Sequence, residues 1–133
     1  MSVGRGSLHS MALDRFSAPT RAWFDASFAA PTDAQIKGWE AIARGDHTLI
    51  HAPTGSGKTL AAFLWAIDRL ATVPTPPPQQ RCRVLYVSPL KALATDIQHN
   101  LEVPLSEIRA VGGELGAPLP EIRALVRTGD TTS

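Results

Sequence analysis

The sequence has 133 residues, 44% of them hydrophobic, which is enough for one domain with a real core. The net charge of +1 neither favours nor excludes a nucleic-acid partner, and no apolar run reaches the roughly 18 residues that cross a bilayer, so no membrane contact is expected. The single cysteine, Cys82, excludes an intramolecular disulfide and is typical of a protein in a reducing cytoplasm. Residues 1–12 begin with a Gly/Ser-rich stretch and are expected to be disordered.

Two short helices are predicted over residues 20–43, with a break at Ala30-Pro31 between them. Thr32 stands directly before the second helix, and Gln35 follows three residues later. A hydroxyl and a carboxamide at this spacing form a capping box, in which each side chain satisfies a backbone N–H of the other residue. We therefore expect the second helix to begin immediately after Thr32.

Strands and helices alternate in the rest of the chain. Apolar runs with β-branched residues, such as Val84 to Val87, are typical of buried strands in a parallel sheet. Apolar residues between them recur at helical spacing, and Pro104 is expected to break or kink the last helical stretch. The alternation predicts an α/β fold, in which a parallel βαβαβ sheet is flanked by helices and preceded by the two N-terminal ones. The expected strands cover residues 48–52, 83–88 and 121–127, and the expected helices cover residues 60–70, 90–101 and 105–114.

The stretch from 52 to 59 reads Ala-Pro-Thr-Gly-Ser-Gly-Lys-Thr, which is the pattern of a phosphate-binding loop. Its glycines let consecutive N–H groups converge on one point, and the N-terminus of the predicted helix adds partial positive charge there. In this interpretation Lys58 is catalytic and reaches the β- and γ-phosphates of ATP, while the Thr59 hydroxyl binds Mg²⁺. The strict pattern has Gly where this chain has Ala52. The predicted cofactor-binding residues of the loop are Ala52, Pro53, Thr54, Gly55, Ser56, Gly57, Lys58 and Thr59.

Several segments together resemble the opening motifs of superfamily 2 (DEAD/DEAH-box type) ATP-dependent helicases. An alanine at the position of Ala52 is usual in that superfamily, so the departure from the strict loop pattern supports the resemblance. Within the superfamily the chain is most similar to the large helicase-related (Lhr) family, from about Leu13 onwards. The segments that carry the resemblance are Pro31-Thr32 with Gln35, Gly38-Trp39, residues 52–59, residues 60–65, Tyr86 to Ala94, and Val126 to Thr131.

This resemblance implies that residues 13–133 are part of the first RecA-like domain of a helicase, ending before the family's Asp-Glu-x-His motif. In the complete protein such a domain couples ATP hydrolysis to movement along a nucleic-acid strand. Gln35 resembles the glutamine that reads adenine in this family, and its alternative role is the helix cap. The implied partner is single-stranded nucleic acid, with DNA favoured, and the implied process is DNA repair. The residues that resemble the family's contacts with a nucleic-acid strand are Ser88, Pro89, Leu90, Lys91, Arg127, Thr128 and Gly129.

The 133 residues contain no Asp-Glu pair, whereas phosphoryl transfer to water needs an acidic residue at the Mg²⁺ site and a group that orients the water. We therefore expect the chain by itself to bind nucleotide weakly and to hydrolyse it negligibly. Unpaired strand edges also predict poor solubility. Two other interpretations stay open: a non-catalytic nucleotide-binding module or remnant, which the missing motif suits, and a small P-loop kinase, which is less favoured. The sequence indicates neither an oligomeric state nor a polarity of movement.

Overall fold

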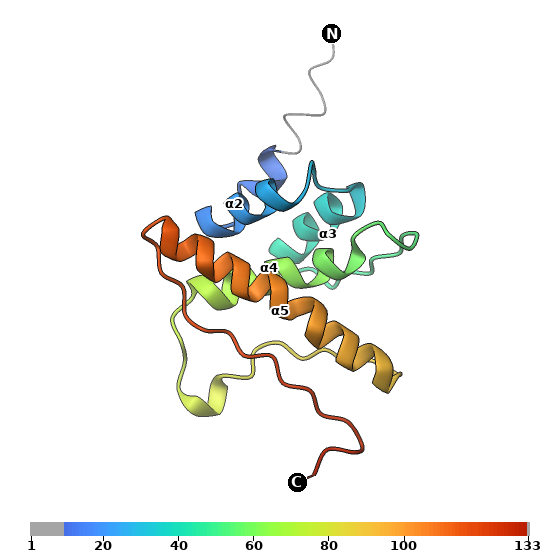
Figure 1. The fold of residues 1–133 in the computed structure, drawn as a ribbon. Coiled ribbons are helices and arrows are strands. Elements are labelled where there is room, and N and C mark those ends of the chain that lie inside the picture. The colour runs from blue at the N-terminus through green and yellow to red at the C-terminus, as the bar shows by residue number, and fades with distance from the viewer. Residues whose placement is uncertain (1–9, 133) are drawn as a thin grey trace.

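The computed structural model describes residues 10–132 (Figure 1). The disorder expected over residues 1–12 falls partly on residues 1–9, which lie outside the described residues. Residues 10–13 form a helical turn, so regular structure begins before Leu13, the expected start of the domain. The further helices are α2 (Ala18–Ser27), α3 (Asp33–Ala43), α4 (Lys58–Thr72), the short 3₁₀ helix η1 (Pro78–Gln80) and α5 (Lys91–Glu114).

Helices α2 and α3 confirm the two helices predicted on either side of Ala30-Pro31. Thr32 caps α3: the Gln35 N–H donates to Thr32 Oγ1 at 3.2 Å, and the Thr32 N–H donates to Gln35 Oε1 at 3.0 Å. Both bonds of the predicted capping box are therefore formed. Because the cap sets the first residue of α3, it also sets where the chain turns from α2 into α3.

The core lies between packed helix pairs, with α3 against α4 and α2 against α5. Trp39 of α3 is fully buried, and its ring meets those of Phe16 and Phe24 edge to face, with centroids 5.0 and 5.7 Å apart. Trp23 of α2 donates from Nε1 to Glu107 Oε2 of α5 at 2.7 Å. The Trp23–Glu107 hydrogen bond joins the first half of the chain to α5. The buried cluster comprises Leu13, Phe16, Trp23, Phe24, Trp39, Phe63, Leu64, Ile67 and Ile108.

Helix α4 confirms the helix predicted over residues 60–70. Its carboxylate Asp68 is buried, and Asp68 Oδ1 accepts hydrogen bonds from the Ser17 N–H at 3.1 Å and the Ser17 hydroxyl at 2.6 Å. Ser17 is the N-cap residue of α2. A polar contact across 51 residues therefore holds the start of α2 against α4, in addition to the apolar packing.

Helix α5 corrects the expectation of two helical pieces over residues 90–101 and 105–114, because it is continuous through Pro104. A proline inside a helix removes one N–H and crowds the carbonyl four residues earlier, which here belongs to Asn100. Asn100 itself is exposed, whereas Pro104 and Ile108, one and two turns further along the helix, are buried. Packing of the buried side keeps the helix intact.

The sheet prediction is wrong for this structure, because no strand is present within residues 10–132. The three segments expected as strands, 48–52, 83–88 and 121–127, carry large exposed side chains: Leu49 is 93% exposed, Leu85 81% and Leu125 86%. A strand satisfies its N–H and C=O groups through a neighbouring strand, so an extended segment without one is not a strand. The α/β class predicted from the pattern is therefore present only in its helices.

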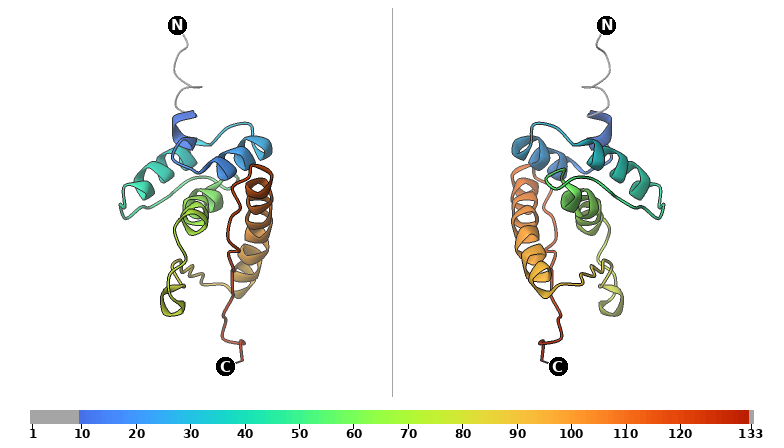
Figure 2. Two further views of the ribbon diagram at one scale, coloured as in Figure 1. Left: turned by 90° about the vertical axis from the view of Figure 1, so that its left-hand side faces the viewer. Right: turned by 90° about the vertical axis from the view of Figure 1, so that its right-hand side faces the viewer.

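The last of these segments nevertheless keeps the alternation of a strand. Ile122, Ala124 and Val126 are half-buried, whereas the residues between them are exposed. The segment runs beside α5 in all three views (Figures 1 and 2), and Gln98 Nε2 of α5 donates to the Ala124 carbonyl at 3.5 Å. Its inner face therefore packs on α5 while its outer face is bare.

Candidate nucleotide-binding site

The phosphate loop lies between the extended segment 48–52 and the first residue of α4. The segment crosses α3 closely at Gly38, where a Cβ would lie 3.0 Å from Ile50 Cδ1. Gly55 and Gly57 have φ values of +83° and +76°, a region that L side chains rarely adopt. A Cβ at Gly57 would also lie 2.3 Å from Gln35 Nε2. Both the backbone angle and the close contact therefore require glycine at position 57.

Hydrogen bonds within the loop close it into a compact turn. The Ser56 N–H and hydroxyl both donate to the Pro53 carbonyl, at 3.2 and 2.6 Å. Lys58 Nζ donates to the Ala52 carbonyl, so its side chain reaches from the end of the loop back to its beginning. The ammonium group therefore lies beside the Ala52 carbonyl at the start of the loop.

The start of α4 provides the electrostatics that an anion needs. The first main-chain bond of the helix runs from the Ala61 N–H to the Gly57 carbonyl at 2.9 Å, so the N–H groups of residues 58–60 precede the helical ladder. No acidic residue occupies the first turn. Free N–H groups, the positive end of the helix dipole and the Lys58 charge all favour a phosphate at this point.

The N-terminus of α3 holds the loop from the other side. The Thr32 hydroxyl donates to the Ser56 carbonyl at 2.7 Å, and Gln35 Nε2 donates to the Gly57 carbonyl at 3.4 Å. Gln35 is only 4% exposed. Its carboxamide has one bond on Oε1 and one on Nε2, which leaves one acceptor and one donor position for a further partner. The sequence identified Thr32 as a helix cap and as part of a family motif, and the structure adds its contact with the loop.

The predicted Mg²⁺ ligand Thr59 is exposed in the first turn of α4. Among residues 10–132, no group of three or more His, Cys, Asp or Glu side chains could hold a metal ion. A single hydroxyl fits Mg²⁺ that is held mainly by nucleotide phosphates and water rather than by a protein cage.

Within residues 10–132, no helix is both long enough and apolar enough to cross a membrane.

The two segments that resemble nucleic-acid contacts, residues 88–91 and 127–129, lie close together. Lys91, the first residue of α5, forms an ion pair with Asp130, with Nζ and Oδ2 2.7 Å apart. Asp130 directly follows Gly129. Ser88 makes weak local contacts with Leu90, at 3.4 and 3.5 Å. The structure therefore brings residues 88–91 and 127–129 to one place on the surface.

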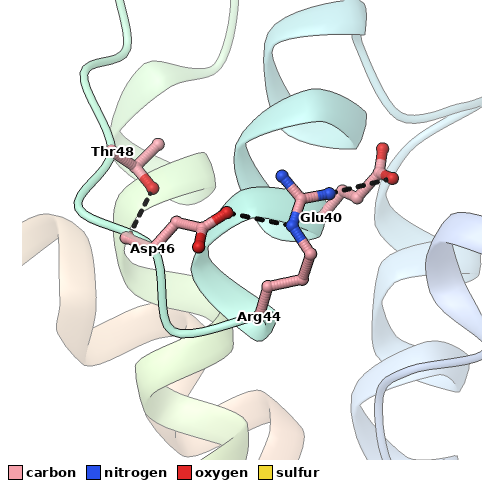
Figure 3. Close-up of polar contacts among 4 residues, drawn as sticks. All are labelled: Glu40, Arg44, Asp46 and Thr48. Atoms are coloured by element: carbon pink, nitrogen blue, oxygen red, sulfur yellow. Dashed lines mark hydrogen bonds and ion pairs between the residues drawn. The ribbon is translucent and has the colours of Figure 1, made fainter.

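A small polar network stabilises the turn that leads from α3 toward the loop (Figure 3). Arg44 donates from Nε to Asp46 Oδ2 at 2.9 Å and from one terminal nitrogen to Glu40 Oε1 at 3.2 Å. The Thr48 hydroxyl donates to the Asp46 carbonyl at 2.9 Å. All the charged groups are about half exposed, so these pairs shape the turn and contribute little stability.

Comparison with known proteins identifies this arrangement. The family model described as DEAD/DEAH box helicase matches residues 32–128, which is well over half of the chain. The chain belongs to the DEAD/DEAH box helicase family. The match begins at the capping residue Thr32 and includes Gln35, the phosphate loop and the segment 88–91. The resemblance stated from the sequence motifs is therefore confirmed.

Two relatives of this DEAD/DEAH box chain are proteins named Lhr. The "Lhr helicase/ probable uracil glycosylase" of Mycolicibacterium smegmatis is 60% identical over 119 residues, which cover 90% of this chain and 8% of the relative. The "ATP-dependent helicase Lhr-Core protein 2" of Thermococcus barophilus is 50% identical over 116 residues, covering 86% of this chain and 13% of the relative.

A solved structure shares the fold. The Mycobacterium smegmatis helicase Lhr bound to ssDNA and AMP-PNP matches with a TM-score of 0.82 and 57% sequence identity, over 91% of this chain and 15% of that chain. This match supports the RecA-like helicase fold predicted from the motifs, although the sheet itself is not formed here. The DEAD/DEAH box chain spans less than a sixth of the length of these relatives.

Proposed function

We propose that this chain is the ATP-binding part of an ATP-dependent nucleic-acid helicase, in which ATP hydrolysis drives movement along a single strand. The observation that carries the proposal is the phosphate loop, which leads directly into the N-terminus of α4. Two of its glycines have positive φ angles, and Lys58 reaches back to the Ala52 carbonyl. The names of the similar proteins, which are helicases, and the AMP-PNP in the related structure support ATP as the nucleotide.

Each residue of the proposed site has a physical role. The N–H groups at the start of α4 and the Lys58 ammonium hold the β- and γ-phosphates, and charge-assisted bonds of this kind are among the stronger ones in proteins. Thr59 contributes one ligand to Mg²⁺, which neutralises phosphate charge when it is bound. The remaining donor and acceptor of Gln35 match N6 and N7 of adenine. Gln35 would then connect the base to the loop through the Gly57 carbonyl.

The proposed domain covers residues 13–133 and is of the RecA-like type. Segments 48–52, 83–88 and 121–127 would become strands of a parallel sheet when further strands lie beside them. Contacts with the nucleic-acid strand are assigned to residues 88–91 and 127–129. DNA is favoured because the related structure contains single-stranded DNA. The proposed location is the reducing cytoplasm, because a single cysteine cannot form an intramolecular disulfide.

Hydrolysis is not expected of these 133 residues alone, because they lack an Asp-Glu pair to complete the Mg²⁺ site and orient water. The second candidate is a nucleotide-binding module without catalysis, which the same phosphate loop would serve. The two candidates agree on the phosphate loop and differ only in turnover.

Titration of the chain with a fluorescent ATP analogue and Mg²⁺ tests the site. Removing the charge in Lys58→Ala should weaken binding at least about tenfold, since a hydrogen bond to a charged group contributes about 1.5–3 kcal/mol. Lys37→Ala is the matched control, because Lys37 is exposed on α3 and should leave the affinity unchanged. Equal affinity of the Lys58→Ala variant and the unmodified chain would reject the proposed site.

A further inference from the structure

One ion pair joins the two segments that are proposed to contact the nucleic-acid strand. Lys91 Nζ and Asp130 Oδ2 are 2.7 Å apart, although the residues are separated by 39 positions in the sequence. Both side chains are accessible to solvent, with 62% and 79% of their surfaces exposed. The only cation of the segment 88–91 is therefore already paired with a carboxylate that lies on the surface.

The position of Asp130 is set by its own turn. The Asp130 N–H donates to Thr128 Oγ1 at 3.3 Å, the Thr128 N–H donates to Thr131 Oγ1 at 2.9 Å, and the Thr131 N–H donates to the Thr128 carbonyl at 3.1 Å. None of these bonds uses the carboxylate of Asp130. The turn therefore presents the carboxylate to Lys91 and would persist if that group lost its charge.

A carboxylate and a phosphodiester offer the same feature to an ammonium group, an anionic oxygen at about 2.7–2.9 Å. An exposed ion pair contributes little net free energy, so an incoming phosphate can replace the carboxylate without a large penalty. The displaced carboxylate would then lie next to a polyanion and repel it. Asp130 consequently opposes the contact that Lys91 is proposed to make.

We infer that Asp130 is a positioning residue that occupies the phosphate position beside Lys91 and is exchanged for a backbone phosphate when a single strand binds. This inference rests on the proposed function of residues 88–91 and 127–129 as strand contacts. Before nucleic acid binds, the carboxylate neutralises Lys91, and it thereby lowers the affinity for the nucleic-acid strand.

The exchange has a signature in the salt dependence of binding. A lysine that neutralises a phosphate of single-stranded nucleic acid contributes about −0.7 to the slope of log K against log salt concentration. A Lys91–Asp130 pair carries no net charge, so its contribution is close to zero. Removing the carboxylate should restore the full contribution of Lys91.

The test is fluorescence anisotropy of a labelled single-stranded oligothymidylate with the 133-residue chain over a series of salt concentrations. Asp130→Asn should bind about threefold more tightly, and its salt slope should be steeper by about 0.7. The gain should vanish when Lys91→Gln is also present. Asp96→Asn is the matched control, because it removes an exposed carboxylate from the same helix α5, and its small effect should not depend on Lys91.

Two results would overturn the inference alone: an Asp130→Asn gain no larger than that of Asp96→Asn, or a gain that persists in the Lys91→Gln background. A chain that binds no oligothymidylate at any salt concentration would instead overturn the proposed strand contacts, and the inference with them. Binding of the unmodified chain therefore tests the proposed contacts with nucleic acid, and the double variant tests the ion-pair exchange.

Discussion

Apolar runs in this chain have different fates in a helix and in an extended segment. Leu64 of α4 is fully buried, whereas Leu85, in a run just as hydrophobic, is 81% exposed. A helix satisfies its N–H and C=O groups within one segment, but a strand depends on neighbours that must be brought beside it. A hydrophobic pattern therefore becomes a buried element only where the backbone can be satisfied as well.

The nucleotide-binding loop and the segments proposed to contact nucleic acid differ in the same way. The phosphate loop is held by the ends of two helices, through Thr32, Gln35 and the first turn of α4, so it is complete without a sheet. The segment that leads to residues 127–129 is joined to α5 by two polar contacts, the Lys91–Asp130 ion pair and the hydrogen bond from Gln98 to the Ala124 carbonyl, and by half-buried side chains. We expect substitutions in the first region to affect stability much more than substitutions in the second.

The largest expected effect is a matched pair of leucine truncations, one in a helix and one in an extended segment. Leu64→Ala should lower the free energy of unfolding by about 3–4 kcal/mol, because it leaves a cavity among fully buried side chains. Leu49→Ala, at a residue that is 93% exposed, should change it by less than about 0.5 kcal/mol. Urea titration followed by circular dichroism at 222 nm measures both. Equal losses would mean that the segment 48–52 is packed in solution.

A smaller effect is expected at the polar contact between α2 and α4. Asp68→Ala removes the acceptor of the Ser17 N–H and hydroxyl and should lower the free energy of unfolding by about 2 kcal/mol. The control is Asp25→Ala, at an exposed residue of α2, which should stay within about 0.5 kcal/mol of the unmodified chain. The same urea titration decides, and an Asp68→Ala variant as stable as the control would show that apolar packing alone holds α2 in place.

The smallest stability change is expected at the cap of α3. Thr32→Val keeps the shape of the side chain but removes the acceptor for the Gln35 N–H and the donor to the Ser56 carbonyl. It should cost about 1 kcal/mol and also weaken nucleotide binding, because it releases one side of the loop. Thr48→Val, which loses only the exposed contact with the Asp46 carbonyl, is the control for both readings. Loss of stability with unchanged nucleotide affinity would limit Thr32 to capping.

Local signals in the sequence predicted the local features correctly. The Thr32–Gln35 spacing gave the start of α3 and its capping box, and the glycines of residues 52–59 gave the loop before α4. In each case the interacting groups lie within a few residues of one another. The motif resemblance predicted the family, which the match over residues 32–128 confirmed.

Features that depend on distant contacts were wrong or were missed. Three runs were expected as strands, but pairing depends on neighbours that a pattern within one segment cannot specify. Pro104 was expected to interrupt the helix, but α5 continues through it, and Pro104 and Ile108 are both buried there. The contacts of Asp68 with Ser17 and of Lys91 with Asp130 join residues 51 and 39 positions apart, and no local pattern signals either.

The central claim is that the helices alone assemble a nucleotide-binding loop. Amide hydrogen exchange of the chain, with and without AMP-PNP and Mg²⁺, tests it most directly. Without nucleotide, we expect protected amides in α3 and α4 and rapid exchange over residues 84–87; with nucleotide, exchange should slow over residues 54–60 and stay rapid over 84–87. Unchanged exchange over residues 54–60 at saturating AMP-PNP, or protection of residues 84–87 equal to that of the helices before nucleotide is added, would contradict the account.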